Sequence, residues 1–340
     1  MMQNGWRLIV GGVVVAGLAV GSIGVTRVLT EPGGKKTHTP KHDPKALEGV
    51  IAAATAKHRQ GLIGEAIAIT SEGVETWPES REMWLVHAEI LMGDEAWAEA
   101  YDAFRVASRF GENEADAEIR FTMGTLAFQM GNLEQSASDY RRAQQLAPGE
   151  AKYPLYLAQV LRRQGDLDGA RAALGRVTVL DDSIPQAWAS LAGIASDAGN
   201  LEAALEYARK ARTLAPEELG WRSLEASILR RGNRAEEAAI LMLAALETLG
   251  EREPRAEIDA VEEAALALGA MGEPDRAAEL WARTADAWPA SPKANFEAAV
   301  GAERIGEASK GVKYAERAAL LGHPLGEAVA ARLRQAAEGT

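Results

Sequence analysis

The sequence predicts an all-α fold made of repeated helical hairpins. Glycines mark a fixed period, since Gly131, Gly165 and Gly199 are each 34 residues apart and Gly272 and Gly306 repeat that interval. Hydrophobic residues make up 47% of the 340 residues and aromatic residues only 6%, with alanine supplying much of the apolar content. Alanine is the strongest helix former and lets helices approach closely. No alternating β-branched run of useful length follows the first 30 residues, so strands are not expected.

A second break follows half a period after the glycines, and it gives the second turn that a chain of helical hairpins needs. Pro148, Pro216 and Pro289 each lie 17 residues after a glycine of the series. Glycine allows the left-handed turn that ends the first helix, and proline ends the second helix or starts the next. Small residues recur five positions after the glycine positions, as successive close helix contacts require: Ala66, Ala100, Ser136, Ala170, Ala204, Ala277 and Gly311.

Residues 185–216 resemble the tetratricopeptide repeat, a helical hairpin of 34 residues. Trp188, Leu191 and Ala192 match its first helix, Gly199-Asn200-Leu201 its turn, and Ala204, Ala211 and Pro216 its second helix. The resemblance implies a right-handed α-solenoid of about eight hairpins over residues 47–324, closed by a charged capping helix over residues 325–340. The units are expected at residues 47–80, 81–116, 117–150, 151–184, 185–217, 218–257, 258–291 and 292–324.

The sixth unit departs from the pattern in two ways. Glu225 and Glu237 stand where small packing residues are expected. About six extra residues follow around Arg252–Glu257. This insertion is either a hinge that divides six repeats from two or an extension of the second helix, and a local irregularity is the preferred interpretation.

Residues 1–28 are predicted to be an N-terminal transmembrane anchor, and residues 29–46 a polar basic linker. Leu8 to Val25 is an uncharged apolar run flanked by Arg7 and Arg27, and 18 helical residues rise ~27 Å, close to the hydrocarbon thickness of a bilayer. A signal peptide cleaved before Ser22 is the alternative. Basic residues after the span favour a cytoplasmic array, whereas the short N-terminal tail with one arginine favours export, so a periplasmic or extracytoplasmic array is preferred.

Charge and composition exclude several classes of function. Residues 1–45 carry six Lys or Arg against two acidic residues, a net charge of +4. Because the whole chain has a net charge of −12, residues 46–340 have a net charge of −16. Such an acidic domain repels nucleic-acid backbones. The chain has no cysteine, and no metal, nucleophile or nucleotide motif is found, so neither a cofactor nor enzyme activity is expected. The Gly17/Gly21 pair is a weak sign of helix pairing and homo-oligomers.

A partner-binding groove is predicted along the first helices of the central hairpins, where tetratricopeptide arrays commonly hold peptides or partner helices. Arginines and aromatic residues are frequent interface anchors, so an acidic segment or a C-terminal carboxylate is the expected partner. The alternative is that the arginines only balance carboxylates on neighbouring hairpins. The predicted groove residues are Phe121, Thr125, Phe128, Lys152, Tyr156, Gln159, Arg162, Arg163, Arg222 and Arg230.

The function predicted from these features is a membrane-tethered scaffold for protein–protein interaction, such as an assembly factor for envelope complexes. Bacterial tetratricopeptide proteins with one N-terminal anchor are similar in organisation. Two alternatives stay open: a regulatory or accessory subunit of an enzyme or secretion complex, and a self-assembling structural protein.

Overall fold

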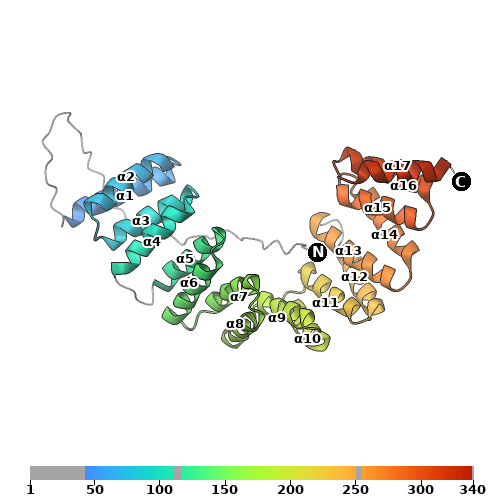
Figure 1. Cartoon of the computed structure of the whole chain (residues 1–340), viewed down its shortest axis with the longest axis horizontal. Coiled ribbons are helices and arrows are strands. Elements are labelled where there is room, and N and C mark those ends of the chain that lie inside the picture. The colour runs from blue at the N-terminus through green and yellow to red at the C-terminus, as the bar shows by residue number, and fades with distance from the viewer. Residues whose placement is uncertain (1–42, 111–115, 250–253, 339–340) are drawn as a thin grey trace. The chain divides into compact units, whose positions relative to one another are not determined.

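The structure, a computed structural model, describes residues 43–110, 116–249 and 254–338. These residues form seventeen α-helices and one short 3₁₀ helix, with no strand among them (Figure 1). The prediction of an all-α array of helical hairpins is confirmed. The predicted anchor and nearly all of the predicted linker lie outside the described residues, and within the described residues no helix is both long and apolar enough to cross a membrane.

The helices follow one another as eight pairs and one final helix. The first four pairs are α1 (Pro44–Arg59) with α2 (Ile63–Thr76), α3 (Arg81–Gly93) with α4 (Trp97–Ala107), α5 (Ala117–Gln129) with α6 (Leu133–Leu146), and α7 (Lys152–Gln164) with α8 (Leu167–Leu180). The 3₁₀ helix η1 (Ser108–Phe110) extends α4. The remaining helices are α9 (Pro185–Asp197) with α10 (Leu201–Leu214), α11 (Leu219–Arg231) with α12 (Ala235–Leu249), α13 (Pro254–Ala270) with α14 (Pro274–Ala287), α15 (Pro292–Arg304) with α16 (Ala308–Leu320), and α17 (Gly326–Glu338).

Small residues let each helix pack on its neighbours in the chain. Ala66, Ala100, Ser136, Ala170 and Ala204 are fully buried, which is the role predicted from their common spacing. Tyr140 lies four residues after Ser136 in α6, and its ring is also buried against α5. Small residues next to large ones produce interdigitated contacts between hairpins.

The turns within the hairpins keep the 34-residue period by placing one residue in the left-handed region. Gly131, Gly165 and Gly199 have φ of +77°, +83° and +78°. Gly232, which lies 33 residues after Gly199, does not continue the series. Gly232 has a φ of −85°, and Asn233, 34 residues after Gly199, takes the left-handed conformation with φ +58°. Asparagine tolerates this region better than most residues do.

The insertion after the sixth unit lengthens helices. α13 has 17 residues, whereas the other first helices from α3 to α15 have 13. α12 has 15 residues and α10 has 14. The extra residues therefore mainly extend α13, the first helix of the seventh hairpin. The expected extension of α12, the second helix of the sixth hairpin, amounts to one residue relative to α10. The expected hinge falls partly on residues 250–253, which lie outside the described residues.

The two unexpected glutamates of the sixth hairpin have different environments. Glu225 of α11 is buried, with 4% of its surface exposed. Its Oε1 accepts a 2.8 Å hydrogen bond from Arg209 Nε and its Oε2 a 2.7 Å bond from Arg212 Nε, both from α10. Glu237 of α12 is exposed and pairs with Arg234 one turn before it. Only Glu225 therefore replaces a small packing residue by an ionic contact between two helices.

The fourth residue of several first helices closes the turn that precedes it. Trp84 Nε1 donates to the Pro78 carbonyl at 2.9 Å, and Trp188 Nε1 donates to the Asp182 carbonyl at 2.8 Å. Asn295 Nδ2 makes the equivalent bond to the Pro289 carbonyl at 3.0 Å. These side-chain donors satisfy carbonyls that the linkers would otherwise leave without a partner.

Candidate functional site

The helix α7 exposes one continuous face. Its buried side chains are Tyr153, Pro154, Leu157, Ala158, Val160 and Leu161. Helical residues three, four and seven apart share a face, and the remaining side chains up to Arg163 follow that spacing. We call this surface the free face of α7 and define it as Lys152, Leu155, Tyr156, Gln159, Arg162 and Arg163, all half-buried or exposed. Five of the predicted groove residues are thus brought together on one helix.

An aromatic cluster borders the free face on the side of α5 and α6. The ring of Tyr156, 38% exposed, meets Phe121 edge-on with their centroids 4.9 Å apart. The Tyr140 ring lies 5.9 Å from Tyr156 and 5.5 Å from Phe121, and burial raises the pKa of Tyr140 to about 12. Thr125, another predicted groove residue, shares a 3.1 Å hydrogen bond with the Tyr140 hydroxyl. Phe121 therefore contacts the Tyr156 ring directly, whereas Thr125 is bonded to Tyr140.

Lys152 at the start of α7 is held by its neighbours. Its ammonium forms an ion pair with Glu118 of α5 and lies 5.4 Å from the centre of the Phe121 ring. The Tyr153 hydroxyl donates to the same Glu118 carboxylate at 2.9 Å. For Lys152 the structure thus shows charge balance with a neighbouring hairpin, which is the alternative to partner binding.

Arg162 and Arg163 at the end of α7 have different surroundings. The Arg163 guanidinium lies 4.5 Å from the centre of the Phe128 ring on α5, so Phe128 belongs to the same surface. Arg162 and Gln159 line a cavity of about 10 Å³ together with Ser190 of α9, which is roughly the space of one water. Both arginines are exposed, and no described carboxylate forms an ion pair with either.

The two predicted arginines of α11 lie outside the free face of α7. Arg230 Nη2 is 3.6 Å from Glu263 Oε2 of α13, so this arginine has a carboxylate partner. Arg222 is half-buried and lies 34 residues after Trp188, at the position where Trp188 closes its turn. α11 packs on α9, α10, α12 and α13. The structure therefore does not place these two residues together with the α7 arginines.

Two members of the surface were not among the predicted residues. Leu155 belongs to the free face, and it follows Phe121 by 34 residues, so the period itself could have indicated it. Ser190 lines the cavity beside Arg162 from α9. Ser190 follows Tyr156 by 34 residues, so the period could have indicated it as well.

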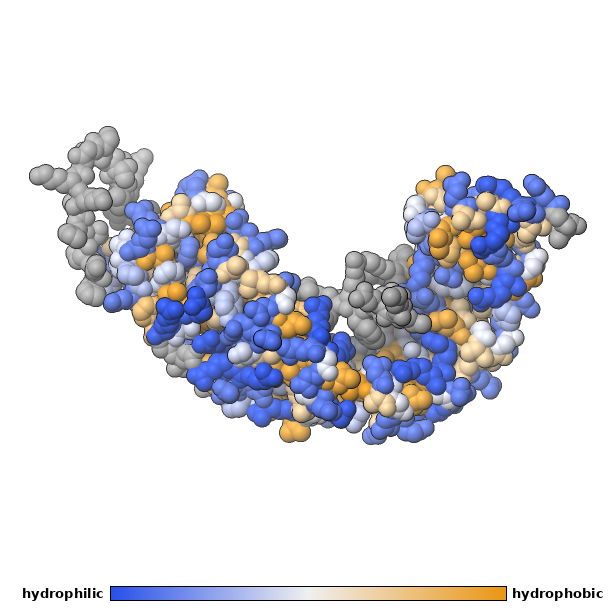
Figure 2. Space-filling model, in the orientation of Figure 1, coloured by the Kyte–Doolittle hydropathy of each residue, from blue (hydrophilic) through white to orange (hydrophobic). Residues whose placement is uncertain are grey.

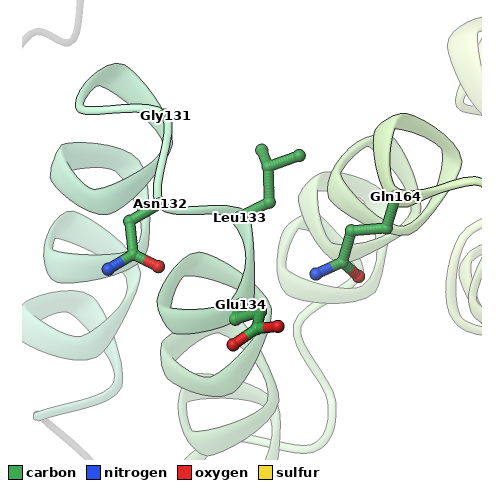
Figure 3. Close-up of a pocket in the computed structure, with 5 residues that line it drawn as sticks. All are labelled: Gly131, Asn132, Leu133, Glu134 and Gln164. Carbon is green, nitrogen blue, oxygen red and sulfur yellow. The ribbon is translucent and has the colours of Figure 1, made fainter.

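A shallow depression of about 510 Å³ lies beside the end of α7. It is lined by the turn residues Gly131 to Glu134 and by Gln164, whose amide points toward the start of α6 (Figure 3). Asn132 caps the N-terminus of α6, where its side-chain oxygen accepts a 3.2 Å hydrogen bond from the Gln135 backbone N–H. No group of three or more metal-ligating side chains occurs among the described residues. Figure 2 shows scattered hydrophobic residues among hydrophilic ones on the visible face.

Comparison with known proteins identifies the repeats. The family model of the tetratricopeptide repeat matches residues 121–187 and, in a second overlapping match, residues 157–218. The crystal structure of a tetratricopeptide repeat protein from Parabacteroides merdae aligns with a TM-score of 0.55 and 13% identity, covering 75% of this chain and 98% of that one. No curated protein matches the sequence significantly.

Two further solved structures have weaker similarity. YrrB, described as a tetratricopeptide protein with an unusual peptide-binding site, aligns at 21% identity and a TM-score of 0.45 over 54% of this chain and 96% of that chain. A MamA structure aligns at 17% identity and a TM-score of 0.47, covering 52% of this chain and 95% of that one. The fold and the matched repeats define an α-helical repeat protein of stacked hairpins. Residues 121–218 of this chain thus match the tetratricopeptide repeat.

Proposed function

We propose that this protein is a membrane-tethered scaffold that binds segments of other proteins on the free face of α7. The observation that carries the proposal is the exposed pair Arg162 and Arg163, which has no ion-pair partner among the described carboxylates although the chain has 49 acidic residues. The cations at Lys152 and Arg230 are paired within the array. Exposed arginines next to exposed aromatic rings are typical of protein-binding surfaces.

The repeat architecture supports the same proposal. Each hairpin contributes side chains at a fixed interval, and such arrays offer extended surfaces for partners. An assembly role at an envelope membrane is the more specific form of the proposal, and it rests on the apolar run Leu8 to Val25.

Site-specific photo-cross-linking tests the binding proposal. A photoreactive amino acid is placed at Gln159, in the middle of the free face, in the full chain expressed in its native cells. The matched control carries the same amino acid at Glu206, an exposed position on α10. We expect a specific protein adduct at Gln159 that is absent at Glu206. Equal patterns at the two positions would refute binding on this face, and an adduct with a second copy of the chain would identify self-assembly instead.

Membrane tethering has its own test. We expect the full chain to remain in the membrane fraction after alkaline carbonate extraction and a chain without residues 1–28 to be released. Protease treatment of intact cells then reports on which side the repeats lie, and degradation of the array from outside is the expected result. Release of the full chain by carbonate would contradict the anchor and favour a cleaved signal peptide.

A further inference from the structure

We propose that the free face of α7 recognises an acidic peptide segment in which an exposed apolar side chain and one or two carboxylates are about three residues apart. This inference rests on the proposed function, since it specifies the partner that the scaffold binds. It derives from three properties of α7: the two arginines without carboxylate partners, the exposed aromatic ring, and the distance between them.

The arginines provide the charged half of the contact. Arg162 and Arg163 lie in the last turn of α7, where the helix dipole already favours positive charge. Their guanidinium groups carry planar forks of N–H donors that match a carboxylate in bidentate geometry. Because Arg163 also stacks on Phe128, its guanidinium is oriented in advance, which lowers the entropic cost of binding.

The acidic surroundings of the arginine pair favour a short acidic segment over a long polyanion. The chain after residue 45 carries −16, so a long polyanion such as a nucleic acid is repelled by the array as a whole. A short segment with one or two carboxylates can instead place its charge on the two guanidinium groups alone. The structure therefore favours a peptide over a nucleic acid as the occupant.

The aromatic ring provides the apolar half of the contact. Tyr156 is 38% exposed and is held edge-on by Phe121. Leu155 beside it is half-buried on the same face. A ring fixed by its neighbours loses little side-chain freedom when it packs against a partner, which makes Tyr156 a suitable anchor for an apolar side chain.

The distance between the two halves sets the spacing in the partner. Tyr156 and Arg163 are seven residues apart on one helical face, a separation of roughly 10.5 Å along the helix. An extended peptide rises ~3.3 Å per residue, so about three residues cover that distance. The expected pattern is an apolar residue and a carboxylate separated by two other residues, in either chain direction.

Selection from a random peptide library displayed against the full chain tests this inference. We expect enrichment of peptides that combine an aromatic or aliphatic residue with Asp or Glu about three positions away. A selected peptide is then synthesised with a fluorescent label, and its Kd is measured by anisotropy at low and at high salt. The companion probe replaces its Asp and Glu by Asn and Gln.

Matched variants separate charge recognition from nonspecific attraction. The double variant Arg162→Gln/Arg163→Gln should raise the Kd for the acidic peptide at least tenfold and reduce the dependence of that Kd on salt. Tyr156→Ala should also raise the Kd but leave its salt dependence unchanged. The control Arg141→Gln/Arg142→Gln removes the same charge from an adjacent exposed pair on α6 and should leave the Kd unchanged. Circular dichroism of each variant checks that the helices are intact.

Three results would overturn the inference: enrichment of peptides without carboxylates, no enrichment at all, or equal weakening by the α6 control pair. Enrichment of non-acidic peptides whose binding still depends on Tyr156 would leave the proposed scaffold function standing. Failure of both the selection and the Gln159 cross-linking would remove the proposed function together with the inference.

Discussion

The buried glutamate of α11 gives the most quantitative prediction of stability. Glu225 accepts one hydrogen bond from Arg209 and one from Arg212, at 2.8 and 2.7 Å, and its side chain is 5% exposed. Glu225→Gln keeps the shape but removes the charge, and the new amide nitrogen turns a donor toward one of the two arginines. Charge-assisted hydrogen bonds contribute about 1.5–3 kcal/mol each.

The expected cost is smaller than the sum of the two bonds. Removing one member of a fully buried ion pair costs about 3–5 kcal/mol. Here the Arg209 and Arg212 side chains are 47% and 35% exposed and regain water, so about 2 kcal/mol is expected for Glu225→Gln. Because each 1.4 kcal/mol is a factor of ten, the slowest amides of α10 and α11 should exchange roughly 30 times faster.

Native-state hydrogen exchange read by mass spectrometry is the suitable assay, because unfolding of a long repeat array need not be two-state. The matched control is Glu237→Gln on the adjacent helix α12, where the carboxylate is exposed and no change in exchange is expected. The local effect should be confined to the hairpins around α10 and α11. Unchanged exchange in Glu225→Gln, or an equal effect in both variants, would show that the buried contact does not hold α11 on α10.

Two further perturbations test the packing and the electrostatics of other hairpins. Gly124→Ala places a Cβ 2.6 Å from a ring carbon of Tyr140, so a local loss of about 1–3 kcal/mol is expected, read as faster native-state hydrogen exchange in α5 and α6. Gly193→Ala, with open space around the new Cβ, should be neutral or stabilising. Burial, helped by the charge of Glu262, raises the pKa of Glu297 above its ordinary value of 4.5. The folded state therefore binds this proton more tightly, and the contribution to stability is full below pH ~4.5 and is lost as the pH rises through the folded pKa. In the wild type, protection of the α13 and α15 amides from hydrogen exchange should increase on acidification, and Glu297→Gln should reduce this increase. If the variant shows the same pH dependence of protection as the wild type, Glu297 is not the group responsible.

The sequence was sufficient for the architecture because the period is carried by the backbone. Each hairpin needs one residue in the left-handed conformation, and Gly165 and Gly199, which take it, can be recognised in the sequence as glycines. At the sixth hairpin a glycine, Gly232, lies 33 residues after Gly199, whereas addition of 34 reaches Asn233, the residue that takes the left-handed conformation. The period was thus a better guide than the residue type.

The site could be predicted only in part because ion pairing depends on neighbouring hairpins. Sequence spacing placed Lys152, Arg162 and Arg163 on one helical face, which the packing of α7 reproduces. It could not show that Glu118 reaches Lys152 or that Glu263 reaches Arg230, since those partners come from adjacent hairpins. Glu225 is a similar case: the pattern marked it as irregular, and only the position of the α10 arginines explains why a carboxylate is buried there.

A charge-swap experiment tests the central claim most directly, because a purely structural role of the arginines cannot produce rescue. The full chain with Arg162→Glu/Arg163→Glu is measured against the selected acidic peptide and against a matched peptide whose Asp and Glu are replaced by Lys. We expect the acidic peptide to lose at least tenfold in affinity and the lysine peptide to bind the swapped chain at least tenfold more tightly than it binds the wild type. Equal affinity of the lysine peptide for both chains, or undiminished binding of the acidic peptide, would contradict the assignment of the free face of α7 as the partner-binding surface.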